Sequence, residues 1–204
     1  MITIIDYGIG NIRAFLNVYR RLNIEARAVT TRDELEGATK VILPGVGHFD
    51  HAMDRLDSSG MRQLLDTLVL EQKVPVLGVC VGMQVLARTS DEGTRDGLGW
   101  IAGRVRAFRA RECSANLPMP HMGWNDVRPV TAHPLFARLS TDSRFYFLHS
   151  YVFETVTDSD QLAVSSYGAD FACAVHHENI YGVQFHPEKS HHFGTRLLQN
   201  FAEL

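Results

Sequence analysis

Short apolar runs alternate with amphipathic stretches through the first half of the chain. Four runs have the aliphatic composition of strands buried on both faces, at residues 2–6, 26–30, 41–43 and 74–79. Three stretches between them place apolar residues on one helical face, at residues 12–22, 49–56 and 61–72. This alternation predicts an α/β fold with a central, mainly parallel sheet flanked by helices. Active sites of such sheets lie beyond the carboxyl ends of the strands.

The second half of the chain is richer in antiparallel strands. Strand character marks residues 100–108, 125–130, 144–154 and 163–167, whereas the intervening residues 118–125 look irregular. A hairpin turning at Glu178 and Asn179 is predicted from residues 171–177 and 180–185, and a closing helix from residues 191–204. We expect an additional antiparallel sheet packed on the parallel one, within a single domain that spans residues 1–204.

The composition narrows the possible functions without choosing among them. Of 204 residues, 45% are hydrophobic and 21% charged, and the net charge is −3 without a cluster of Lys and Arg, so a nucleic-acid partner is not expected. No apolar run approaches a membrane span. Three unpatterned cysteines argue against a disulfide framework and favour the cytoplasm, and we interpret Cys113 and Cys173 as structural or incidental. Adjacent histidines such as His176 and His177 point to opposite faces of a strand, so neither a metal nor a cofactor is expected.

The sharpest chemical signal is Cys80, which directly follows an apolar strand and precedes a helix-forming run at residues 83–88. Gly78 and Gly82 flank it two positions away on each side, which allows the tight strand-to-helix elbow of a nucleophile. The unpaired amides and the dipole of a helix N-terminus favour the thiolate form of a cysteine there. The amide of Val81 points at the same spot and can hold an oxyanion. A buried structural cysteine is the alternative, and a base elsewhere in the chain must decide between the two.

Two glycine-rich turns follow strands at the same predicted edge. Residues 7–11 lack the third glycine of a dinucleotide-binding loop, so phosphate binding is not expected. Residues 44–47 (Pro-Gly-Val-Gly) can be a simple tight corner. Alternatively, their amides can supply a second oxyanion donor or cradle a substrate backbone beside Cys80.

His186 provides a candidate base at the end of a late strand. Pro187 stops that strand, so His186 and Glu188 share one loop, and the carboxylate can reach one ring nitrogen. Such a Cys-His-Glu set suits either acyl transfer through a thioester or redox chemistry. Acyl transfer is favoured, because no second cysteine stands close in sequence to resolve an oxidised thiol.

Together these motifs, residues 78–84 and 186–188, resemble class I (triad-type) glutamine amidotransferases. Further stretches resemble one family of that class, the glutaminase subunits of imidazole glycerol phosphate synthases. They lie in order along almost the whole chain, at residues 6–12, 44–49, 120–125, 147–151 and 184–190. The resemblance implies that Cys80 attacks the side-chain amide of glutamine, with His186 as base and then acid and Glu188 as its orienter. It also implies an oxyanion hole from the amides of Val81 and of Val46 or Gly47, and a glutamine site that includes Gly45, Gln84, His149, Ser150 and Tyr151.

The same resemblance implies a partner. The ammonia would pass to a (βα)₈-barrel cyclase subunit in a heterodimer, which forms imidazole glycerol phosphate and an aminoimidazole carboxamide ribotide in histidine biosynthesis. Family members hold the turn at residues 44–47 inactive until the cyclase binds its substrate, so the isolated chain should show little activity. Positions that match the cyclase interface are Asn11, Trp124, Tyr146 and Lys189.

Two positions depart from the family pattern. Pro118 stands where the family usually has Lys, which puts one interface contact in doubt. Val81 replaces the usual leucine after the nucleophile, which hardly matters because its backbone amide acts. Alternatives are an amidotransferase subunit of a related synthase (for example one that aminates a sugar), a non-catalytic regulatory subunit, and a stand-alone γ-glutamyl peptidase.

Overall fold

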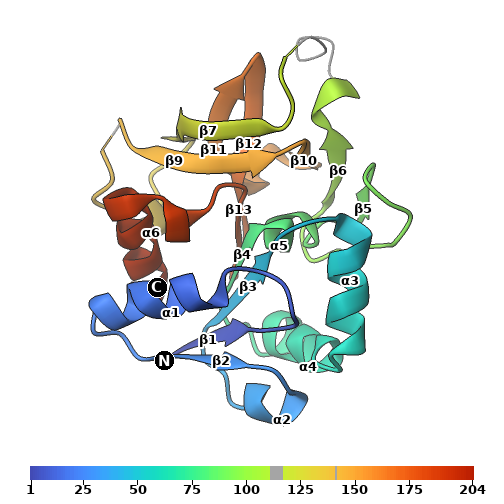
Figure 1. Ribbon diagram of the computed structural model, residues 1–204, viewed down its shortest axis with the longest axis vertical. Helices are drawn as coiled ribbons and strands as arrows, with labels where there is room; N and C mark the ends of the chain where they lie inside the picture. Colours follow the sequence, from blue (N-terminus) through green and yellow to red (C-terminus); the bar gives the residue numbers. More distant parts are fainter. Residues whose placement is uncertain (111–116, 141) are drawn as a thin grey trace.

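The computed structural model describes residues 1–110, 117–140 and 142–204, and it confirms a mainly parallel sheet in the first half of the chain. Neighbouring strands of its parallel part are β2 (Ala26–Val29), β1 (Ile2–Ile5), β3 (Val41–Gly45), β4 (Val76–Cys80) and β13 (Ile180–Val183) (Figure 1). The carboxyl ends of β3, β4 and β13 therefore meet at one edge. Cys113, which we interpret as structural or incidental, lies outside the described residues.

Antiparallel strands extend this same sheet beyond β13. The predicted hairpin is confirmed, because β12 (Ala169–His177) pairs antiparallel with β13. The sheet continues through β10 (Tyr151–Thr155), β6 (Gly103–Ala107) and β5 (Thr89–Ser90), while β11 (Gln161–Tyr167) and β8 (Arg128–Pro129) branch from β12. The hydrogen-bond ladder thus links both halves of the chain without a break.

A separate two-stranded antiparallel ribbon lies above this sheet, formed by β7 (His121–Asp126) and β9 (Arg144–His149) (Figure 1). The prediction of irregular structure at residues 118–125 is therefore wrong. Pro118 and Pro120 before β7 and Gly123 within it are untypical of a strand. The strand is also partly exposed and shows little alternation of apolar and polar residues, so its sequence carries no clear strand signal. The single strand predicted at residues 144–154 is also divided, because the chain turns at Ser150 from the ribbon into the main sheet.

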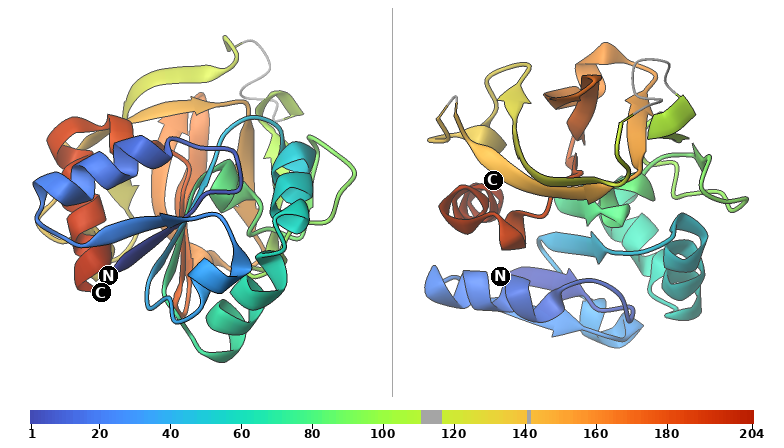
Figure 2. Two further views of the ribbon diagram at one scale, coloured as in Figure 1. Left: turned by 60° about the horizontal axis from the view of Figure 1, so that its bottom comes forward. Right: turned by 45° about the horizontal axis from the view of Figure 1, so that its top comes forward.

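Helices cover both faces of the parallel strands. Helices α1 (Ile12–Arg21) and α6 (His191–Glu203) lie on one side, and α3 (Phe49–Ser58) and α4 (Arg62–Asp66) on the other (left panel of Figure 2). All four were predicted, although α3 extends two residues beyond the predicted range of 49–56. A π-helical turn, Thr67–Glu71, continues α4. The short helix α2 (Arg32–Leu35) was not predicted, and Thr31 and Glu34 form a capping box at its start.

The helix after the nucleophile is shorter than predicted. Helix α5 spans Val81–Gln84 instead of residues 83–88. Beyond it, the carbonyls of Val85 and Ala87 accept hydrogen bonds from Leu98 and Gly99, so a loop satisfies groups that another helical turn would have used. Short 3₁₀ turns complete the fold at Phe108–Ala110, Pro134–Phe136, Asp158–Asp160 and Pro187–Lys189. Within the described residues, no helix is both long and apolar enough to cross a membrane.

Candidate active site

Cys80 occupies the predicted elbow, as the last residue of β4 and the residue directly before α5. Its backbone has a φ of 57° and a ψ of −114°, outside the regions that L-residues normally adopt. Such strain costs on the order of 1–3 kcal/mol and persists where the surrounding structure enforces it. The thiol, 5% exposed as part of its residue, thus stands at the carboxyl edge of the sheet.

Glycines permit this elbow because backbone atoms occupy the space that their side chains would fill. A Cβ on Gly78 would lie 2.9 Å from the Cα of Met83, and one on Gly82 would lie 2.9 Å from the carbonyl carbon of Leu43 and closer still to its oxygen. Gly45 pairs with Cys80 across β3 and β4, where a Cβ would lie 2.9 Å from the carbonyl carbon of Val81. The elbow and the turn that begins at Pro44 are therefore packed backbone against backbone.

His186 and Glu188 meet as predicted. Nδ1 of His186 lies 2.9 Å from Oε1 of Glu188, and the two side chains are 3% and 1% exposed. The second ring nitrogen, Nε2, remains for the Cys80 thiol, which lines the same cavity as the imidazole. Burial alone would lower the pKa of His186, but the hydrogen bonds and charges of Cys80 and Glu188 raise it to about 9. The imidazole is consequently protonated at neutral pH.

The Glu188 carboxylate has a second partner, Asn11, whose Nδ2 donates to the same Oε1 over 2.9 Å. Burial alone would raise the pKa of Glu188, yet the hydrogen bond and positive charge of His186 and the bond from Asn11 lower it. The structure therefore places Asn11 beside the triad, although we predicted it as an interface residue. That interface role stays a prediction.

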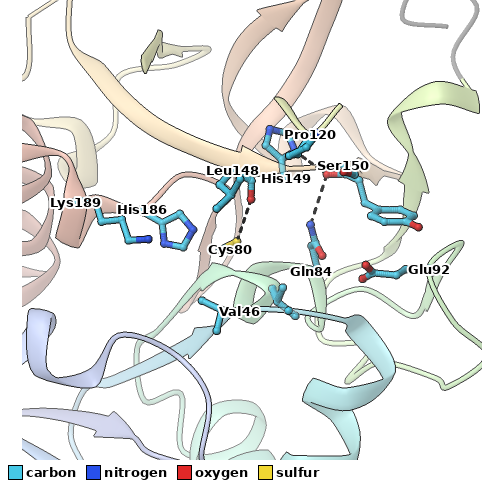
Figure 3. Close-up of a pocket in the computed structure, with 13 residues that line it drawn as sticks. Val46, Cys80, Gln84, Glu92, Pro120, Leu148, His149, Ser150, His186 and Lys189 are labelled. Carbon is cyan, nitrogen blue, oxygen red and sulfur yellow. Dashed lines mark hydrogen bonds between the residues drawn. The ribbon is translucent and has the colours of Figure 1, made fainter. Parts of the chain in front are cut away.

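A cavity of about 320 Å³ opens over Cys80. In Figure 3, Cys80 and His186 lie on one side of it, and Gln84 and Glu92 lie further along. Its size lies at the lower end of the range of small-molecule sites. The predicted residues that line it, besides Cys80 and His186, are Val46, Gly47, Val81, Gln84, His149, Ser150, Tyr151 and Lys189.

Glu92, Pro120 and Leu148 line this cavity although none featured in the predicted site. Neither did Gln184 and Tyr7, which contact Cys80 and the turn at Pro44. Glu92 brings a carboxylate into its wall, where Oε2 accepts from the Phe49 N–H over 2.8 Å and burial raises the pKa of the carboxyl group. Gln184 is fully buried, and its Nε2 donates to Sγ of Cys80 over 3.8 Å. Tyr7 donates its hydroxyl to the Pro44 carbonyl over 2.6 Å and so ties β1 to the turn beside Cys80. Glu92 lies in a polar loop, where periodicity gives no signal.

The other predicted interface residues form one cluster at the edge of the cavity, which Lys189 also lines. The ring of Trp124 packs edge-on against Tyr146 with centroids 6.2 Å apart, and Nζ of Lys189 lies 5.8 Å from the Tyr146 ring centroid. Trp124 is 39% exposed, and its ribbon also exposes Met122 (64%) and Leu148 (38%). Among the residues that the structure describes, no three His, Cys, Asp or Glu side chains form a group suited to a metal ion.

Comparison with known proteins identifies the class that this fold and site define. The family model for "Glutamine amidotransferase class-I" matches residues 3–204, so the chain belongs to that class. A solved structure described as a glutamine amidotransferase is similar in fold, with a TM-score of 0.77 at 21% identity, covering 99% of this chain and 97% of that one.

Closer relatives define the particular family. The chain is 60% identical to the imidazole glycerol phosphate synthase subunit HisH of Bdellovibrio bacteriovorus, and 52% identical to the protein of that name from Leptospira interrogans. Both matches cover all of this chain and all of the relative. The chain belongs to the family of imidazole glycerol phosphate synthase HisH subunits.

Proposed function

We propose that the chain hydrolyses glutamine to glutamate and ammonia through a thioester on Cys80. The sulfur attacks the γ-carbonyl carbon, and the electron pair of the carbonyl moves onto its oxygen. Protonated His186 then gives its proton to the amide nitrogen, the C–N bond breaks, and ammonia leaves. Water, deprotonated by the now neutral His186, attacks the thioester carbon; the C–S bond breaks, glutamate departs with its last proton released to solvent, and the sulfur and the protonated His186 return to their starting states. Glu188 keeps the imidazole oriented and stabilises its charge in both steps.

The negative oxygen of each tetrahedral intermediate needs donors beside Cys80. The amide of Val81 begins α5, and the turn containing Val46 and Gly47 lines the same cavity, which supports these residues as the oxyanion hole. At the far end of the cavity, the Glu92 carboxylate offers a partner for the α-ammonium group of glutamine. Gln84, His149, Ser150 and Tyr151 line the wall between these ends and are proposed to hold the substrate, with Gly45 beneath.

The ammonia product requires a partner, because in water it would become protonated and be lost. We propose that a cyclase subunit docks on the exposed face of the β7–β9 ribbon and uses the ammonia to make imidazole glycerol phosphate in histidine biosynthesis. Its apolar side chains Met122, Trp124 and Leu148 are exposed beside the cavity, and Tyr146 and Lys189 add an aromatic ring and a cation. An apolar patch rimmed by polar groups is typical of protein interfaces.

The single observation that carries the proposal is the meeting of Cys80 with the distant pair His186 and Glu188: Cys80 and His186 line one cavity, and His186 is hydrogen-bonded to Glu188. The test measures glutamate release by the purified chain alone, and then with a cyclase subunit and that subunit's ligand. Low activity alone and a large rise in the complex, abolished by Cys80→Ala, would support it. High activity alone would favour a free-standing peptidase, and stimulation only by a different synthase would favour the related-synthase alternative. Partner function that needs glutamine but survives Cys80→Ala would contradict the mechanism.

A further inference from the structure

Two buried histidines adjoin the cavity without belonging to the triad. His121 of β7 and His149 of β9 are directly paired across the ribbon and are 4% and 5% exposed. Nδ1 of His121 lies 2.8 Å from Nε2 of His149, and aromatic rings, including Phe108 and Phe147, surround both. Because buried polar groups are costly unless hydrogen-bonded, each of the four ring nitrogens is expected to have a hydrogen-bond partner.

Both imidazoles are neutral at physiological pH. Burial lowers the pKa of His121 to about 4 and, together with the charges of His121 and His186, that of His149 to about 3, against the opposing effect of a hydrogen bond to Tyr151. A neutral imidazole has one nitrogen that donates and one that accepts. The partners of the outer nitrogens therefore determine the direction of the bond between the two rings.

One end of the chain of hydrogen bonds is fixed by a carbonyl group. Nδ1 of His149 lies 2.8 Å from the backbone oxygen of Tyr151, which can only accept, so this nitrogen carries the proton. Nε2 of His149 must then accept, and Nδ1 of His121 must donate to it.

The other end is fixed by the side-chain amide of Asn125. Its oxygen accepts from the Asp126 N–H over 2.8 Å, and its nitrogen donates to the Ser166 carbonyl over 2.8 Å, which sets the orientation of the amide. Its nitrogen also lies 3.2 Å from Nε2 of His121, to which it donates. His121 thus accepts at Nε2 and donates at Nδ1, the direction that the Tyr151 carbonyl requires.

The Tyr151 carbonyl links this chain to the cavity. It also accepts from Nε2 of Gln84 over 3.5 Å, and that amide nitrogen donates to Oε1 of Gln184 over 3.0 Å. Gln184 in turn donates to the Cys80 sulfur. A continuous series of hydrogen bonds therefore leads from Asn125 in the ribbon, through the rings of His121 and His149, to Gln84 in the cavity wall.

We propose that His121 is a positioning residue for glutamine binding, because its Nδ1–H satisfies the buried Nε2 of His149 and so holds that ring where its own Nδ1–H reaches the Tyr151 carbonyl and, through it, the Gln84 amide. The inference rests on the proposed function, in which Gln84 and Tyr151 contact glutamine. Without the donor at His121, the buried Nε2 of His149 loses its hydrogen-bond partner, and the ring is no longer held in the position from which its Nδ1–H reaches the Tyr151 carbonyl. The substrate-binding wall loses its order, while the triad is untouched.

The experiment compares two variants in complex with the cyclase subunit and its ligand. His121→Phe fills the ring space without a donor, whereas His121→Asn keeps an N–H near the position of Nδ1. We expect His121→Phe to raise KM for glutamine about tenfold with kcat within about threefold of wild type, the pattern of lost ground-state binding. His121→Asn should restore KM to within about threefold of wild type. His133→Asn, a histidine outside this network, serves as the control and should change neither constant.

A second readout follows the proton directly. Nitrogen-15 NMR of the imidazoles should show Nδ1 protonated in both His121 and His149 of the wild-type chain, and in His121→Phe the Nε2 resonance of His149 should shift to that of a nitrogen that accepts no hydrogen bond. An Nε2-protonated His149 in the wild type would overturn the proposal, as would an unchanged KM in His121→Phe or a loss confined to kcat. The wild-type spectrum decides the tautomers even if a variant does not fold. Failure of the proposed function would appear separately, as a wild-type complex that does not hydrolyse glutamine.

Discussion

Replacing Gly82 by alanine tests how closely the elbow and the neighbouring turn depend on each other. A Cβ at Gly82 would lie 2.9 Å from the Leu43 carbonyl carbon, and ordinary van der Waals contact begins at 3.4 Å. Because the Leu43 oxygen would lie closer still, the end of β3 and the start of α5 must separate by well over about 0.5 Å, which exceeds the tolerance within which catalytic groups must be held. Because a displacement of 1 Å can cost about a hundredfold in rate, we expect kcat to fall about tenfold to a hundredfold.

The assay is glutamate release by the cyclase complex, with chemical denaturation to measure stability. Overpacking should lower the free energy of unfolding of Gly82→Ala by about 1–3 kcal/mol. The control is Gly37→Ala, an exposed position with a φ of 72° and no atom within 4 Å of an added Cβ. It should lose about 1–2 kcal/mol of stability from its left-handed backbone alone and keep its kcat. A folded Gly82→Ala variant with wild-type kcat would refute the reasoning.

Three further predictions concern the triad and the ribbon. Because the pKa of His186 is raised from 6.5 to about 9, its protonated form stabilises the fold fully below about pH 6.5, and the free energy of unfolding should decrease as the pH rises through about 9. The pH profile of kcat/KM should fall over its upper limb near the same pH, and a limb near 6.5 would contradict this assignment. Asn11→Ala removes a charge-assisted hydrogen bond to buried Glu188 and should cost about 1.5–3 kcal/mol in denaturation experiments, whereas exposed Asn17→Ala should cost less than about 0.5 kcal/mol. Equal losses for both would argue against that bond. Trp124→Ala should weaken cyclase binding in calorimetry by about 2 kcal/mol or more, while Val156→Ala, at the far end of β10, should leave it unchanged; equal affinity for both variants would place the interface elsewhere.

Local sequence rules anticipated that Cys80 and His186 would share one site and that His186 would meet Glu188, because each lies in a short motif with a steric reason. The glycines around Cys80 permit the elbow, and Pro187 keeps His186 and Glu188 on one loop. The parallel strands and four main helices also followed from periodicity, since their buried faces are continuous and apolar.

The features that the sequence did not predict depend on contacts between residues that are far apart in the chain. The ribbon strand β7 has a weak apolar pattern, so its pairing with β9 and the His121–His149 contact could not be anticipated. Strands β9 and β10 join different sheets, although residues 144–154 form one continuous β-type run. Glu92 reaches the cavity from a polar loop, and Asn11 reaches Glu188 across 177 residues of sequence. Only the folded chain brings these groups together.

The most direct test of the mechanism is mass spectrometry of the cyclase complex, quenched rapidly with acid during turnover of glutamine and analysed both intact and after digestion at low pH. A glutamyl group should appear on the peptide that contains Cys80, at the mass of glutamine less ammonia, and it should be absent from Cys80→Ala. Glutamate formation at the wild-type rate by Cys80→Ala, or an acyl group on another residue, would contradict the thioester mechanism.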